Sequence, residues 1–158
     1  MDAYIGLVSD GERLIGYVCD GDVVSVWFEG TVDGDSIRLS SGRGDLLGEG
    51  TISDDASGEI EIQGENRAFN APRVSGDAGL YRAVVGDASN ERIVEGGWIV
   101  LPNGSQRGAI TMEGGGDVTE ILTAPPIYPP VQGGVDLGRF GRVRVGKVTD
   151  VDASILGG

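Results

Sequence analysis

The sequence contains no histidine, one cysteine and one lysine. Without histidine, the chain cannot build Ser-His-Asp or Cys-His nucleophile arrangements, or a metal site that needs histidine. Cys19 has no partner for an internal disulfide. It lies beside an acidic turn, which raises rather than lowers a thiol pKa, so we expect a small buried residue and not a reactive thiolate. These absences predict a protein that is not an enzyme.

Basic side chains are also scarce, with 12 Lys and Arg against 25 Asp and Glu and a net charge of −13. Binding of phosphates requires clustered Lys and Arg, so the charge argues against nucleic acid as a partner. It argues equally against an anionic membrane surface. No apolar run approaches the roughly 20 residues that a spanning helix needs. We therefore expect no nucleic-acid partner and no membrane-spanning segment in this chain.

Carboxylates are plentiful, but their spacing selects no site. A glycosidase uses a pair of carboxylates, and nothing in the sequence singles out one pair. Calcium would be the natural metal for oxygen ligands. The acidic tripeptides at 20–22, 33–35 and 53–55 do not follow the twelve-residue EF-hand loop. We interpret them as plain turns and expect no metal, no cofactor and no catalytic residue.

Glycine, by contrast, is abundant, with 29 residues, and it often follows aspartate. Asp-Gly occurs at 10–11, 20–21 and 33–34. Between apolar runs this dipeptide is the strongest short-range signal for a β-hairpin, because a type I′ turn needs φ > 0 at both positions. If the second and third are such turns, Tyr17 lies opposite Val24 and Phe28 lies opposite Leu39.

The pacing of turns continues to about residue 105. Turn-like clusters alternate with strand-like stretches such as LLGEGTI (46–52) and GEIEIQ (58–63), at a spacing of roughly ten residues that is typical of barrels and sandwiches. No segment shows a convincing apolar period of 3.6. Tight sequential hairpins favour a meander, and closure removes edge strands. The predicted fold is all-β, an antiparallel up-and-down meander β-barrel of about eight to ten strands with an extended C-terminal arm.

The region after residue 116 has a different composition. We predict a β-barrel domain over 1–116, followed over 117–158 by a proline-rich link and a C-terminal strand. Residues 1–120 carry 22 acidic and 8 basic side chains, whereas 121–158 carry 3 acidic and 4 basic ones. We therefore expect the arm to dock on its own barrel or on a neighbouring copy.

Apolar residues on both faces of the first strands predict a contact surface. The turn register places a patch on the outer face of the barrel, made of Leu7, Leu14, Val18, Val23 and Trp27. An outer face is normally polar, so a contiguous apolar patch indicates a contact. We expect the arm to cover it with the strand Arg142, Val143, Arg144 and Val145. A protein partner, a second copy, or a sandwich that exchanges inside and outside are the alternatives.

The order of several motifs resembles a family of uncharacterised actinobacterial extracytoplasmic domains. The motifs are YVCDG, WFEGTVDGD, AGLYRA and GGWIVLPNGSQRG, followed by a proline-rich link and a late strand. Members are secreted, lipid-anchored or membrane-tethered, and some follow a kinase domain. The resemblance implies an extracytoplasmic or secreted location and carries over no catalytic residue. The opening residues MDAYIGLVSD show no signal peptide, so either the protein starts in the cytoplasm or a leader lies outside this sequence.

Three kinds of function remain. The first is a non-catalytic extracytoplasmic module that binds a protein or an envelope component. The second is a structural or decoration protein of a virion or other assembly, for which the methionine start and the arm argue. The third is a small-ligand barrel of the lipocalin or streptavidin type, with Tyr4, Tyr17 and Phe28 lining its interior near the mouth.

Overall fold

The computed structural model describes residues 3–21, 24–41, 44–87, 92–114, 117–127, 135–136 and 142–148. Its first strands are β1 (Tyr4–Ser9), β2 (Arg13–Cys19), β3 (Ser25–Asp33), β4 (Ser36–Ser40), β5 (Leu46–Ile52), β6 (Ala56–Ile62) and β7 (Glu65–Ala71). They are followed by β8 (Gly79–Asp87), β9 (Arg92–Val100), β10 (Gln106–Gly114), β11 (Asp117–Thr123), β12 (Val135–Asp136), β13 (Arg142–Val143) and β14 (Gly146–Lys147). The residues in these ranges form no helix that is long and apolar enough to cross a membrane.

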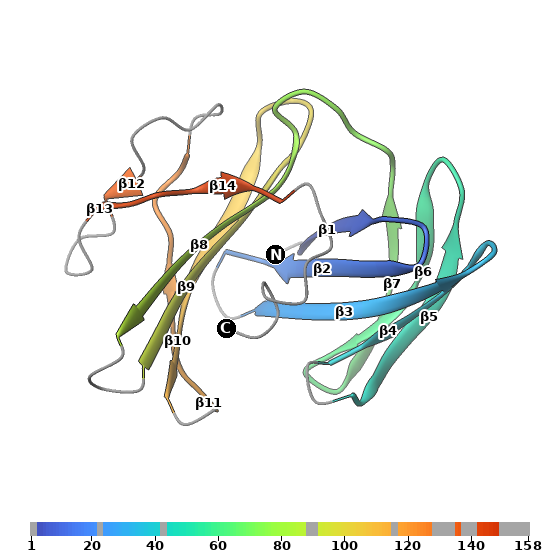
Figure 1. The fold of residues 1–158 in the computed structure, drawn as a ribbon, viewed down its shortest axis with the longest axis horizontal. Coiled ribbons are helices and arrows are strands. Elements are labelled where there is room, and N and C mark those ends of the chain that lie inside the picture. The colour runs from blue at the N-terminus through green and yellow to red at the C-terminus, as the bar shows by residue number, and fades with distance from the viewer. Residues whose placement is uncertain are drawn as a thin grey trace.

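The strands form two main sheets. Strands β1 to β7 pair in sequence order as an antiparallel meander that curls into a half-barrel, on the right in Figure 1. The second sheet has the order β11-β10-β9-β8-β14, and β12 pairs with β13. The predicted all-β antiparallel meander is confirmed. It is divided between a half-barrel and a second sheet that packs on the outer face of its first strands, whereas the sequence pacing favoured one barrel.

Strand positions follow the sequence pattern closely in the middle of the chain. Strand β5 covers the same residues as the predicted stretch 46–52. In β6, Ile60 and Ile62 are buried while Glu59 and Glu61 are exposed, as their alternation predicted. The position of a strand with one buried and one exposed face can therefore be predicted from its alternation of apolar and polar residues.

The hairpin between β2 and β3 differs from the predicted two-residue turn. Asp20 closes a wider loop, in which its carboxylate accepts a hydrogen bond from the Val24 amide at 2.9 Å. The Asp20 amide donates in turn to the Val24 carbonyl. Tyr17 consequently lies opposite Trp27 instead of Val24. A shift of three residues exchanges the faces, so Phe28 packs with Leu14 and not with Tyr17.

The hairpin between β3 and β4 lies one residue later than predicted. Gly34 and Asp35 form its turn, and only Gly34 has a positive φ, of 60°. The type I′ prediction is therefore wrong here, since that turn needs positive φ at both residues. Gln63 and Gly64, between β6 and β7, do satisfy this requirement, with φ of 53° and 79°.

The inner side of the half-barrel is filled by side chains. Its buried residues are Leu14, Val18, Val24, Phe28, Ile37, Leu39, Ile60 and Ile62. The Phe28 ring lies against Gly16, where a Cβ would overlap it. Each fully buried aliphatic or aromatic side chain of this kind contributes roughly 1.5–3 kcal/mol. The interior is thus a packed core.

The second sheet packs on the outer face of β2. Ile15, Tyr17 and Cys19 point away from the half-barrel interior and are buried against the second sheet, where their neighbours are Leu80, Ile99 and Ala109. From Leu14 to Cys19, β2 is consequently buried on both faces. This arrangement explains why the sequence is apolar at consecutive positions there.

Candidate functional site

The buried polar residues Ser25, Glu95 and Thr111 lie at the junction of the two sheets. Tyr17 and Trp27 lie opposite each other on β2 and β3, with ring centroids 4.5 Å apart. They rest on Gly97 of β9, where a Cβ would lie 2.6 Å from the Tyr17 ring. The missing side chain at Gly97 therefore allows the two sheets to approach through these rings.

Three hydroxyl groups connect the sheets across this junction. The Tyr17 hydroxyl lies 2.6 Å from that of Ser25, which lies 2.7 Å from that of Thr111 on β10. Burial raises the pKa of Tyr17 well above its usual value. The phenol consequently stays protonated and serves as a structural hydrogen-bonding group.

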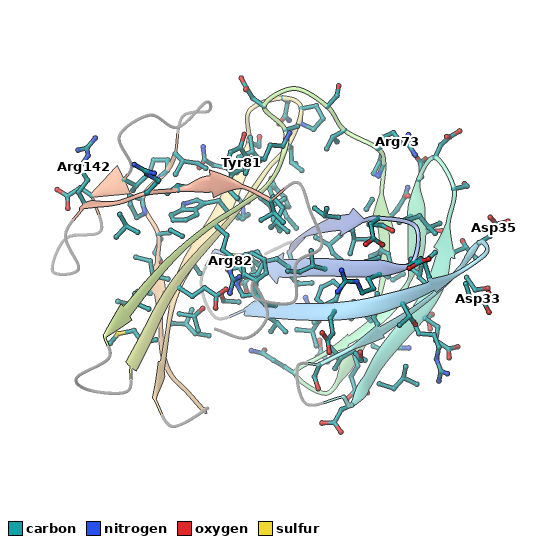
Figure 2. All side chains as sticks on the ribbon, viewed as in Figure 1. Asp33, Asp35, Arg73, Tyr81, Arg82 and Arg142 are labelled. Atoms are coloured by element: carbon teal, nitrogen blue, oxygen red, sulfur yellow. The ribbon has the colours of Figure 1, made fainter. Side chains whose placement is uncertain are left out.

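An ion pair completes the cluster. Arg82 on β8 donates its Nε–H to Glu95 on β9, and both side chains are nearly inaccessible to solvent. The guanidinium lies 4.9 Å from the centre of the Trp27 ring, within cation–π range. In Figure 2, Arg82 points between the two sheets, while the neighbouring Tyr81 lies on the other side of β8. A buried pair of this kind makes either partner costly to remove.

Cys19 lies at the edge of the same cluster. Its Sγ accepts a hydrogen bond from the Gly21 amide at 3.2 Å, and burial raises the pKa of the thiol. A protonated and buried thiol is a poor nucleophile. Nearby, the guanidinium of Arg107 stacks on the Tyr4 ring at 4.7 Å. Within the described residues, no group of three or more acidic or cysteine side chains is arranged to hold a metal ion.

The predicted outer patch is not one surface, and this prediction is wrong. Leu14 and Val18 line the half-barrel interior, with Leu7 packed against them. Trp27 faces the other way and packs in the cluster between the sheets. Val23 lies outside the described residues. The three-residue shift of the β2–β3 hairpin is the physical reason, because it moves Trp27 to the face of Tyr17.

The three aromatic residues that were predicted to line a barrel mouth lie in two different clusters. Phe28 is in the core of the half-barrel. Tyr17 and the partly buried Tyr4 belong to the cluster between the sheets. The structure therefore does not bring them together around one cavity.

The arm docks on the second sheet, and the prediction that it covers the patch is wrong. Val143 and Val145 are buried, whereas Arg142 and Arg144 are exposed, as the alternation predicted. The valines pack in a cluster with Tyr81 and Trp98 of the second sheet. Residues 117–123, assigned to the link from sequence, form β11 and pair with β10. The described part of the arm contacts the second sheet of its own chain.

Sequence reasoning missed the residues that join the sheets and hold the arm. The principal ones are Arg82, Glu95, Trp98 and Gln106. One signal was present, since Glu95 interrupts the apolar stretch RIVEGGWIVL, and a carboxylate buried there requires a partner. That partner, Arg82, is 13 residues away and cannot be inferred from spacing alone.

Comparison of the chain with models of protein families, with curated proteins and with solved structures finds no match. The resemblance to actinobacterial extracytoplasmic domains stays a prediction.

Proposed function

We propose that the protein is a non-catalytic extracytoplasmic β-module that acts by binding a protein or an envelope component through its outer surface. The observation that carries this proposal is the filled half-barrel. Leu14, Phe28 and Leu39 are fully buried at its centre. Ligands in barrels of the lipocalin type occupy the space that these side chains fill, so a small-ligand role receives less support.

The state of the polar groups gives further support. The Tyr17 and Ser25 hydroxyls are engaged with each other inside the molecule. The Cys19 thiol is buried, and Arg82 is paired with Glu95. Groups committed to structural contacts in this way are not poised to contact a substrate.

The outer face of β4–β6 is the surface best suited to a partner. It is polar and strongly acidic, with Glu49 directly opposite Glu59 and Glu61 further along β6. Arg38, at 3.6 Å from Glu49, compensates part of this charge. We expect a partner that presents positive charge to this face.

Co-sedimentation with isolated cell envelopes tests the proposal. Wild-type protein should sediment with the envelopes at low salt and less at high salt. The variant Glu49→Gln/Glu59→Gln/Glu61→Gln should lose most of this binding. The control Glu12→Gln/Asp77→Asn/Asp136→Asn removes the same charge from exposed positions elsewhere and should bind as wild type does. Equal loss in both variants would indicate a net-charge effect, and no sedimentation of wild type would contradict the proposal.

A structural role in a virion or other assembly is the second candidate. The observation that favours it is the C-terminal arm, which is held by contacts of a kind that proteins use between chains.

A further inference from the structure

The second sheet holds the start of the arm as a binding domain holds a peptide. The indole Nε1 of Trp98 donates to the Pro125 carbonyl at 2.9 Å. The Gln106 side-chain amide makes two hydrogen bonds with the backbone of Ile127, donating at 2.7 Å and accepting at 2.8 Å. An aromatic residue and a side-chain amide that fix extended proline-rich backbone are typical of intermolecular peptide recognition.

Residues 146–148 of the arm bind the same sheet as an added strand. Gly146 and Lys147 pair with Arg82 and Tyr81 of β8, and the ladder is only two residues long. Two further hydrogen bonds fix it, from the Val148 amide to Leu80 and from the Lys147 ammonium to Gly76. Side chains at alternate positions, the two valines described above, occupy the apolar surface beneath. Strand addition with alternate anchors is again a mode of recognition between chains.

We infer that the surface along β8, formed by Leu80, Tyr81 and the Trp98 ring, is also a docking site for the β12–β14 segment of a second copy of the chain. The Pro125–Ile127 anchor stays on its own Trp98 and Gln106. A neighbour's segment would make the same contacts as this segment makes in cis, so exchange leaves their free energy unchanged. Such an exchange of identical elements is a low-cost route to a closed dimer. The inference goes beyond the proposed envelope or protein partner, because its partner is the chain itself.

The length of the link limits exchange to neighbours that lie close together. Residues 128–134 separate the Pro125–Ile127 anchor from β12, which pairs with β13 and therefore belongs to the docking segment. At about 3.1 Å per residue, this link reaches roughly 22 Å when extended. Exchange therefore requires that the β8 edges of the two copies face each other.

Charge favours the arm as the element that reaches across. Two copies with a net charge of −13 repel each other over most of their surfaces. The docked arm presents Arg142, Arg144 and Lys147, all three exposed. It is the segment whose approach to an acidic neighbour is favourable at low ionic strength.

The unique lysine provides a direct test. Unlabelled and ¹⁵N-labelled full-length protein are mixed in equal amounts, unfolded in urea, refolded together and separated by size. A carbodiimide then couples the Lys147 ammonium, which contacts Gly76, to a neighbouring carboxylate, with Asp77 as the expected acceptor. Mass spectrometry determines whether the two peptides of each cross-link carry the same nitrogen isotope or different ones.

Arm exchange predicts a dimer whose Lys147 cross-links join light and heavy chains about as often as like chains. The monomer should carry only like pairs. Val143→Asp/Val145→Asp, which cannot seat the arm, should give neither the dimer nor the cross-link. Absence of a dimer at all concentrations, or a dimer with only like pairs, overturns the inference. Because this reading uses wild-type protein, it decides the question even if the control variant fails to fold.

Discussion

Strands β2 and β6 belong to the same sheet, but they have different surroundings. Strand β2 is buried on both faces from Leu14 to Cys19. Strand β6 buries Ile60 and Ile62 on one face and exposes glutamates on the other. The second sheet covers the outer side of the first three strands and leaves that of β4–β6 in solvent (Figure 1). Loss of alternation in a strand therefore reports a second layer of structure.

The two regions should also differ in the contacts that stabilise them. The β2 side depends on contacts between residues far apart in the sequence, such as Ser25 with Thr111. The β6 side depends on neighbouring hairpins in a meander. Substitutions at the sheet junction should therefore cost more than equivalent substitutions on the outer face of β4–β6.

The largest expected effect is at the buried ion pair. Arg82→Ala removes the cation that pairs with the buried Glu95 carboxylate, which should destabilise by about 3–5 kcal/mol. Arg38→Ala removes the matched but exposed pair with Glu49 and should cost no more than about 1 kcal/mol. Urea denaturation monitored by tryptophan fluorescence measures both. Similar losses in the two variants would contradict the difference between the regions.

The packing of β2 on the second sheet should give the next largest effect. Ile15→Ala removes a fully buried side chain at the junction and should cost about 2–5 kcal/mol. Glu61→Ala, at an exposed position of β6, should change stability by no more than about 0.5 kcal/mol. If Ile15→Ala were as mild as Glu61→Ala in thermal unfolding, the second sheet would not be packed on β2.

Glycine at position 97 should matter because the aromatic rings rest on it. Gly97→Ala introduces a Cβ 2.6 Å from the Tyr17 ring, and overpacking of this kind costs about 1–3 kcal/mol. Gly146 provides the control, because a Cβ there meets nothing within 4 Å. Chemical denaturation of Gly97→Ala and Gly146→Ala should separate them clearly, and equal midpoints would show that the rings lie elsewhere.

The smallest expected effect is a loss of folding stability in alkaline solution, where Cys19 and Tyr17 deprotonate. Burial raises the pKa of Cys19 above the ordinary 9.0 and that of Tyr17 above the ordinary 10.0. Both groups are neutral when protonated, and the folded state keeps its protons longer than the unfolded state. Stability is therefore complete below about pH 9 and falls as the pH rises through this range. In urea titrations at a series of pH values, Cys19→Ser/Tyr17→Phe should fall less steeply than wild type.

The sequence predicted the all-β meander and the edges of β5, because hairpin signals and alternation are local. It missed the register of β2 on β3, since the Asp20 carboxylate captures the Val24 amide and widens the loop. That one shift moved Trp27 to the opposite face and invalidated the predicted patch. It also missed the pairing of Arg82 with Glu95, because such contacts depend on how two sheets meet, which no local pattern encodes.

The central claim is that the second sheet lies directly on the outer face of β2 and β3. The most direct test is Ser25→Cys/Thr111→Cys in a Cys19→Ser background, because the two native hydroxyl oxygens are 2.7 Å apart. The control pair, Ser25→Cys/Thr51→Cys, places the second thiol on exposed β5. After mild oxidation, intact-mass analysis with thiol alkylation should find one internal disulfide in the Ser25/Thr111 variant and two free thiols in the control. Two alkylated thiols in a folded Ser25/Thr111 variant would contradict the account.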